Sequence, residues 1–150
     1  MGDEVVVVRL GSGRFAISMG QVAEVGRVPV LTRVPGLPSF LAGAANWRGR
    51  VLAVVDLRLL LGANPADSYP VSRIAVLTSR AATVGLLVDE VVSTTRIDPD
   101  EIAPFPSSIP VAAMGLLTGQ VARPEGPIAM LDVDAVMALR ESLPRGRRSA

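Results

Sequence analysis

The sequence contains neither cysteine nor histidine. Their absence removes the disulfide bond, the thiolate nucleophile and the imidazole base from the chemistry available to the chain. It excludes Ser-His triads and leaves a zinc ion without its usual sulfur and nitrogen ligands. Lysine is also absent, so the 15 basic residues are all arginines, and the net charge is only +1. Because a nucleic-acid surface normally needs a marked basic excess, we expect no such surface here.

Aromatic residues and long apolar runs are scarce as well. There are one Trp, one Tyr and three Phe, while 49% of the residues are hydrophobic. The core must therefore consist of Val, Leu, Ile and Ala, and the many valines favour strands. No segment approaches the roughly 20 apolar residues that span a bilayer, and the N-terminus does not resemble a signal peptide. We expect a soluble cytoplasmic protein.

Short strands with turn signals between them dominate the predicted secondary structure. Val5–Val8 are consecutive valines and indicate a strand that is buried on both faces. Gly11–Gly13 is a hairpin turn rather than a phosphate loop, because a strand follows it where a phosphate loop needs a helix. Further strands are expected at residues 51–55, 72–78, 83–88, 90–97 and 128–131. This pattern is typical of a β-barrel or a sandwich and makes βαβ units improbable.

Helices are predicted to be few and short. Ser18 and Ser39 are candidate N-caps for helices over residues 18–25 and 39–45. Residues 57–61 form a short helix or a turn that Gly62 ends. A C-terminal helix over about 133–142 starts at Asp132 or Asp134. Residues 62–70 are the clearest flexible connection, and we expect a boundary between two subdomains near them.

Two groups of carboxylates are the candidates for catalysis. Asp89 and Glu90 follow a predicted strand, and Asp98, Asp100 and Glu101 lie in a proline-bounded loop. An enzyme that used them would need a pocket in which their pKa values are perturbed. Turn caps and solvated charges are the simpler interpretation. We therefore expect no enzyme activity, no cofactor and no metal.

A segment of small residues ends in Asn46-Trp47-Arg48-Gly49 and leads directly into a buried strand. That strand ends in Asp56-Leu57-Arg58. Arg48 has two equally weighted interpretations: a structural side chain bonded to carbonyls or to a carboxylate such as Asp56, or a partner contact. Trp47 is either a plug in the core or an exposed anchor.

The order of these motifs resembles the CheW family of bacterial chemotaxis coupling proteins, over roughly residues 5–140. Both Asn46-x-Arg48-Gly49 and Asp56-Leu57-Arg58 match this family. Trp47 departs from its usual aliphatic residue. The other matching segments are Phe15–Ile17 with Val22-x-Glu24-Val25, Thr32–Pro35, Pro38–Gly43, Val84–Val91, Gly115-Leu116 and Met130–Asp132.

The resemblance implies a fold and its division along the chain. The fold is mainly β, with two small SH3-like five-stranded β-barrels packed on a shared hydrophobic core and short helices that include a C-terminal one. A single domain would span residues 1–143, followed by a flexible tail at 144–150. The first barrel would span about 4–61 and be completed by a strand near 128–132, and the second would span about 70–127.

The resemblance also implies partners and a binding site. Members bind the regulatory domain of a CheA-type histidine kinase and the cytoplasmic tip of methyl-accepting chemoreceptors, and are recruited to membrane-associated receptor arrays. The matching contact positions are Val22, Glu24, Gly43, Asn46, Arg48, Gly49, Val88 and Val91. Alternatives are an adaptor in a non-flagellar pathway such as pilus motility, an excised kinase regulatory domain, and, from another class, a small β-barrel carboxylate enzyme.

Overall fold

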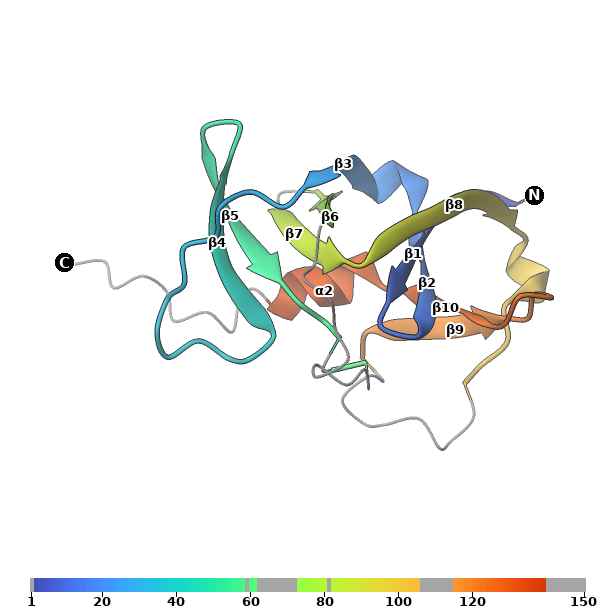
Figure 1. The fold of residues 1–150 in the computed structure, drawn as a ribbon. Coiled ribbons are helices and arrows are strands. Elements are labelled where there is room, and N and C mark those ends of the chain that lie inside the picture. Colours follow the sequence, from blue (N-terminus) through green and yellow to red (C-terminus); the bar gives the residue numbers. More distant parts are fainter. Residues whose placement is uncertain (1, 59, 62–72, 81, 106–114, 140–150) are drawn as a thin grey trace.

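The strands form two five-stranded sheets, each curled into a small barrel, in a computed structural model that describes residues 2–58, 60–61, 73–80, 82–105 and 115–139 (Figure 1). Barrel A has the strand order β8-β1-β2-β10-β9, and barrel B has the order β3-β6-β7-β5-β4. The strands of barrel A are β1 (Asp3–Leu10), β2 (Gly13–Ser18), β8 (Glu90–Ile97), β9 (Leu117–Val121) and β10 (Ile128–Leu131). The strands of barrel B are β3 (Val22–Arg27), β4 (Leu41–Trp47), β5 (Arg50–Val55), β6 (Arg73–Ser79) and β7 (Ala82–Val88). Among the described residues, the helical elements are the 3₁₀ turns η1 (Met19–Gln21) and η3 (Pro99–Glu101) and the helix α2 (Val133–Leu139).

Barrel B is formed by the consecutive strands β3–β7, and barrel A by β1 and β2 together with β8–β10, so the predicted division near residues 62–70 is wrong as a boundary between barrels. Strands β3, β4 and β5 precede this segment, and β6 and β7 follow it, yet all five lie in barrel B. Strands β1 and β2 instead pair with β8 and β10. The turn signals in the sequence locate strands but carry no information on pairing between distant strands. Residues 62–70 themselves lie outside the described part of the chain.

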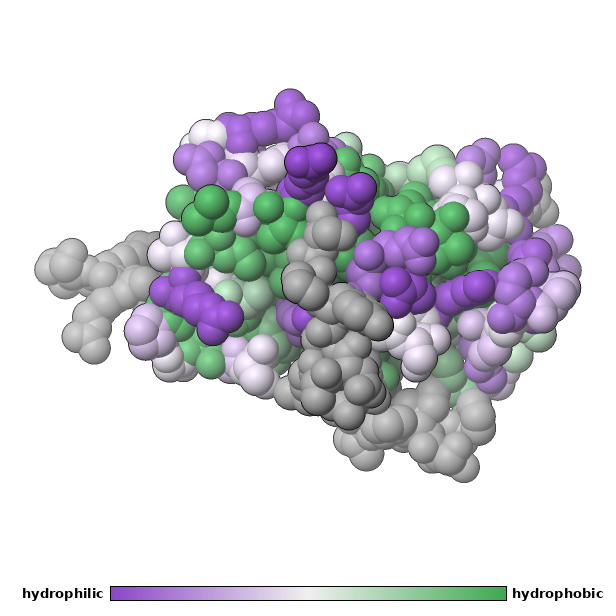
Figure 2. Space-filling model, viewed as in Figure 1, coloured by the Kyte–Doolittle hydropathy of each residue, from purple (hydrophilic) through white to green (hydrophobic). Residues whose placement is uncertain are grey.

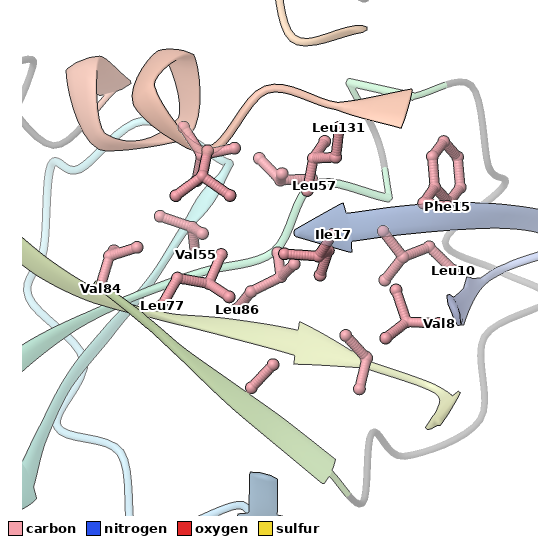
Figure 3. Packing of buried hydrophobic residues seen from close by; sticks show 14 of the residues in the cluster. Val8, Leu10, Phe15, Ile17, Val55, Leu57, Leu77, Val84, Leu86 and Leu131 are labelled. Carbon is pink, nitrogen blue, oxygen red and sulfur yellow. The ribbon is translucent and has the colours of Figure 1, made fainter. Parts of the chain in front are cut away.

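The buried residues form three apolar clusters, and these explain why strands such as β1 and β6 are buried on both faces. Val5 and Val7 point into the core of barrel A, whereas Val6 and Val8 point into a core shared by both barrels (Figure 3). Strand β6 does the same in barrel B, where Ile74 and Val76 face the barrel's own core and Leu77 faces the shared one. The strand predicted over the four valines is therefore confirmed, together with its burial on both faces.

Two predicted helices are strands. The segment predicted as a helix over residues 39–45 becomes β4, where Ala44 and Ala45 pair with β5. Alanine has a high helix propensity, but pairing with β5 in the barrel overrides it. The helix predicted from Ser18 is limited to the single turn η1, after which Val22 starts β3. β-Branched residues such as Val22 and Val25 suit a strand better than a helix.

Several local predictions are confirmed. β8 and β10 have the predicted bounds, and Gly11 turns the β1–β2 hairpin with a φ of 63°. Asp132 is the residue that caps α2, because its Oδ1 accepts a hydrogen bond from the Ala135 N–H at 3.2 Å. The predicted end of this helix at 140–142 and the tail at 144–150 lie outside the described residues. Within the described residues, no helix is long and apolar enough to cross a membrane.

Candidate functional site

The motif that dominates the sequence forms the tip of the β4–β5 hairpin. Its two turn residues, Arg48 and Gly49, have φ values of 51° and 78°. Two positive φ values are what a tight two-residue hairpin turn requires, and glycine adopts them without strain. The Asn46 Oδ1 accepts a hydrogen bond from the Gly49 N–H at 3.1 Å and so fixes the turn. The hairpin thus holds Arg48 at an exposed tip, with polar surface above an apolar area over β4 and β5 (Figure 2).

Arg48 forms a two-bond ion pair with Glu24 of β3. Its Nε lies 3.2 Å from Glu24 Oε1, and its Nη2 lies 3.0 Å from Glu24 Oε2. The acceptor is therefore Glu24 and not Asp56, the carboxylate suggested by the sequence. The hydrogen bonds from Arg48, and to a smaller extent from Trp47, lower the pKa of Glu24. Glu24 in turn raises the pKa of Arg48.

Trp47 combines both roles that the sequence left open. Its ring packs against the core of barrel B, and its Nε1–H donates a hydrogen bond to Glu24 Oε1. The Arg48 guanidinium lies over the same ring, 5.4 Å from its centre. Since the Arg48 side chain is still 68% exposed, the cluster presents a cation, a carboxylate and an indole to solvent at one place.

Gly43 lies within β4 at a position that no other residue fits well. Its φ is 146°, and a Cβ there would lie 2.5 Å from the carbonyl oxygen of Thr32. The neighbouring Ala44 exchanges two backbone hydrogen bonds with Thr32, at 2.7 and 2.9 Å. Gly43 therefore allows the chain after β3 to approach β4 and close barrel B.

The three predicted valines belong to the shared core rather than to the hairpin tip. Val88 is fully buried, at 0% exposure. Val22 and Val91 are partly buried and pack against the same core. Val22 still connects the two places, because it lies two residues before Glu24 on β3.

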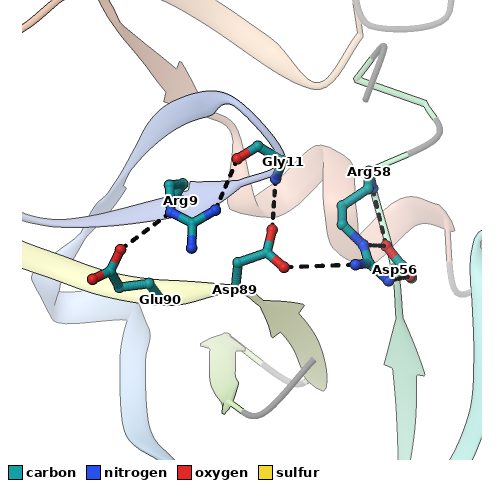
Figure 4. A network of polar contacts seen from close by, with 6 residues as sticks. All are labelled: Arg9, Gly11, Asp56, Arg58, Asp89 and Glu90. Atoms are coloured by element: carbon teal, nitrogen blue, oxygen red, sulfur yellow. Dashed lines mark hydrogen bonds and ion pairs between the residues drawn. The ribbon is translucent and has the colours of Figure 1, made fainter. Parts of the chain in front are cut away.

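A polar network that the sequence did not reveal links the two barrels (Figure 4). Arg58 bonds Asp56 through Nε at 2.9 Å and Nη2 at 2.6 Å, and its Nη1 lies 3.6 Å from Asp89 Oδ1. Asp89 Oδ2 then accepts the Gly11 N–H at 2.6 Å, so the network reaches from the end of β5 to the β1–β2 turn. The hydrogen bonds to Asp56 raise the pKa of Arg58 against the opposing effect of burial. The Asp-Leu-Arg signal was visible in the sequence, but its link to Asp89 was not.

The other carboxylate group serves as a helix cap. Asp98 and Glu101 form a capping box around η3, in which the Asp98 N–H donates to Glu101 Oε2 at 2.8 Å. Glu101 also pairs with Arg123 at 3.2 Å. In the part of the chain that the structure describes, no group of three or more Asp and Glu side chains could hold a metal ion.

The fold and this site define a class of protein: two small barrels on one shared core, with an exposed Asn-x-Arg-Gly hairpin tip. Residues 4–141 match the family described as CheW-like domain, and the chain belongs to that family. The chain is 30% identical over 142 residues to a probable chemotaxis protein CheW of Rhizobium etli, with 94% of this chain and 92% of the relative covered. It is 34% identical over 115 residues to protein FrzA of Myxococcus xanthus, covering 77% of this chain and 72% of FrzA.

A solved structure supports the same assignment. The crystal structure of the scaffolding protein TtCheW from Thermoanaerobacter tengcongensis superposes with a TM-score of 0.77 at 27% identity. The superposition covers 89% of this chain and 86% of TtCheW. The expected architecture of SH3-like barrels on a shared core is thereby confirmed.

Proposed function

We propose that this protein is a non-catalytic adaptor that couples chemoreceptors to a CheA-type histidine kinase. In this proposal it acts in the cytoplasm and is recruited to membrane-associated receptor arrays. Its family is one of chemotaxis and scaffolding proteins, which supports the adaptor role. The hairpin tip with Asn46, Arg48 and Gly49, together with Glu24, is the proposed contact surface.

The observation that carries the proposal is the exposed Glu24–Trp47–Arg48 cluster. A guanidinium fork that is mostly exposed can exchange its intramolecular carboxylate for a partner's carboxylate or carbonyl. An indole and an arginine side by side are also the residue types that dominate binding energies at interfaces. Val22, Val88 and Val91 pack in the shared core and are part of the proposed site only through Val22, which lies on the same strand as Glu24, whereas Gly43 fixes the position of β4 behind the tip.

The test is a titration of Arg48→Ala against two purified partners: a kinase regulatory domain and a receptor cytoplasmic fragment. Loss of one charge-assisted hydrogen bond at an interface should weaken binding roughly tenfold. Arg48→Lys should restore little, because an ammonium group cannot replace the planar fork. Arg50→Ala is the matched control, since Arg50 is an exposed arginine on the same hairpin.

A melting curve separates binding from folding in this test. If Arg48→Ala binds both partners normally but melts at a much lower temperature, Arg48 is a structural residue and the proposed contact is wrong. The adaptor role predicts a second result: the protein changes autophosphorylation of the kinase when receptor is present. Turnover by the purified chain that disappears in Asp89→Asn would instead indicate a carboxylate enzyme.

A further inference from the structure

The two barrels have the same strand plan, which allows each position in one barrel to be matched with a position in the other. Strands β8, β1, β2, β10 and β9 correspond in order to β3, β6, β7, β5 and β4, and both barrels contain one parallel pair in the same place. The register shifts also correspond. Glu24 pairs with Val76 after one skipped residue of β3, and Ser93 pairs with Val7 after one skipped residue of β8.

The closures of the barrels correspond too. Gly43 precedes the bridge between Thr32 and Ala44, and Gly119 precedes the bridge between Ala103 and Gln120. Counted four residues on from each glycine, Trp47 at the end of β4 matches Arg123, which lies two residues after the end of β9. Ser93 and Arg123 are therefore the barrel A counterparts of Glu24 and Trp47.

In barrel B the space beside these residues is filled by the Trp47 side chain, whereas the corresponding space in barrel A is a hollow. Trp47 packs against the barrel B core and bonds Glu24. The corresponding hollow in barrel A has a volume of about 350 Å³. Its floor includes Val7 and Ile128 of the barrel A core. The residues around them are Arg14, Val92, Ser93, Thr94, Thr95, Arg123 and Glu125.

One cation at this hollow, Arg14, has no carboxylate partner among the described residues. Arg14, Arg123 and Glu125 line the hollow, and the Arg123 Nη2 bonds Glu101 at 3.2 Å and the Arg96 carbonyl oxygen at 3.1 Å. No carboxylate of the described residues lies within 4.0 Å of the Arg14 guanidinium, and the buried Nε of Arg123 has no hydrogen-bond partner among them. Barrel B supplies its carboxylate from Glu24, but the matching residue in barrel A is the uncharged Ser93.

We propose that this hollow binds an acidic side chain from an extended segment of another protein, which supplies the carboxylate that Ser93 lacks. β8 is an edge strand of barrel A, so an extended segment can lie beside Val92–Thr95 while its carboxylate reaches Arg14 and Arg123. Arg14 lies two residues before Ala16 on β2, on the face that lines the barrel interior, so the carboxylate enters the mouth of the barrel. This inference does not depend on the proposed contact at Arg48.

The test is a titration, followed by backbone amide NMR, with the blocked pentapeptide acetyl-Val-Glu-Val-Glu-Val-amide. The matched controls are the same peptide with Gln and with Lys in place of Glu. The Glu peptide should shift the amides of β8 and the β9–β10 turn, with an affinity roughly tenfold above that of the Gln peptide. Equal shifts with the Gln peptide, or shifts confined to barrel B, would overturn the proposal.

Two variants sharpen the test. Ser93→Glu places a carboxylate where barrel B has Glu24, so it should raise the melting temperature and prevent peptide binding. Thr118→Glu, an equal change of charge on an exposed position of β9, should leave binding within about twofold. Arg14→Gln should weaken binding as Ser93→Glu does, and it removes no ion pair of the described residues. If Ser93→Glu and Arg14→Gln both bind the Glu peptide as the wild type does, the hollow is not the binding site of the peptide.

Discussion

At the scale of single residues, two ion pairs of different burial define the polar chemistry of the protein. The Glu24–Arg48 pair lies at an exposed hairpin tip, where the side chains are 34% and 68% exposed. The Arg58–Asp89 pair lies between the barrels, where they are 11% and 8% exposed. Water screens the first pair, so a charged group of a partner can replace one of its members. The second pair is largely shielded from water, which therefore does not compete with it. We therefore expect the first pair to serve recognition and the second to serve folding.

The lowered pKa of Glu24 predicts a pH dependence of stability. A carboxylate whose pKa is lower in the folded protein stabilises it fully above the unfolded value, and this contribution is lost as the pH falls through the folded value. The free energy of unfolding of Glu24→Gln should thus be below that of the wild type at pH 7. The difference should shrink as the pH falls below the ordinary pKa of 4.5 and disappear below the lower pKa that Glu24 has in the folded protein. Urea unfolding at a series of pH values measures this. A difference that stays constant down to acid pH would contradict the prediction.

Removal of the Arg58 guanidinium should lower the free energy of unfolding substantially. Arg58→Ala leaves Asp56 and Asp89 next to each other without their cation, so we expect a loss of about 3 kcal/mol in the free energy of unfolding. The control is Arg96→Ala, which removes an exposed pair with Glu4 at 3.5 Å and should cost less than about 1 kcal/mol. Equal losses in the two variants would show that Arg58 does not join the barrels.

At the scale of elements, the glycines in β4 and β9 close the two barrels. An added Cβ at Gly43 would lie 2.5 Å from the Thr32 carbonyl oxygen, and one at Gly119 would lie 2.9 Å from the Ala103 carbonyl oxygen. Both partners are backbone atoms of a bridged segment, so they cannot move aside without breaking the bridge. The two glycines thus perform one function in two unrelated stretches of sequence.

We expect Gly43→Ala to lower the free energy of unfolding by about 2 kcal/mol, since it combines a backbone clash with an unfavourable φ. Gly119→Ala should act in the same direction. Gly26→Ala in β3 is the control, because a Cβ added there would have no atom within 4 Å and should change stability by less than about 0.5 kcal/mol. Chemical denaturation measures the free energy of unfolding of the three variants. If Gly43→Ala leaves this free energy unchanged, the proposed role of Gly43 in closing barrel B is wrong.

The sequence predicted elements better than it predicted their partners. Strand bounds at Glu90–Ile97 and Ile128–Leu131 follow from local turn residues and β-branched runs, which act within a few positions. The helix expected over residues 39–45 was wrong because alanine propensity is a weaker effect than pairing with β5. Glu24 and Arg48 were each named as contacts, but their mutual pairing depends on barrel closure, which no local pattern encodes.

At the scale of the whole molecule, the shared core makes the barrels one folding unit. Leu86 of β7, a strand of barrel B, is fully buried in it, together with barrel A residues such as Ile17 and Leu131 (Figure 3). Barrel B is one continuous segment, from β3 to β7, inserted between β2 and β8 of barrel A, so barrel A cannot close until the chain returns from barrel B. A substitution that disrupts the packing of this core should therefore destabilise both barrels.

Leu86→Ala should lower the free energy of unfolding by about 2–5 kcal/mol through the lost burial and the cavity. Trp47, the single tryptophan, reports on barrel B by fluorescence, and amide exchange in β1 reports on barrel A. Both probes should show the same midpoint and the same shift. Val51→Ala, at a position that is 85% exposed, should shift neither. Separate midpoints for the two probes would mean that the barrels unfold independently.

The division of barrel A into two separate stretches of the chain determines when this protein can fold during its synthesis. When the ribosome has completed β5, the nascent chain holds β1 and β2 without their partners β8 and β10, and β3 and β5 without β6 and β7. Val5 and Val7 of β1, which face the core of barrel A, therefore remain uncovered until β8, β9 and β10 have emerged. Barrel B, whose strands β3–β7 are consecutive in the chain, can form once β7 has emerged, whereas barrel A must wait for β8–β10. A translation pause between β7 and β8 therefore prolongs the exposure of an aggregation-prone strand, β1.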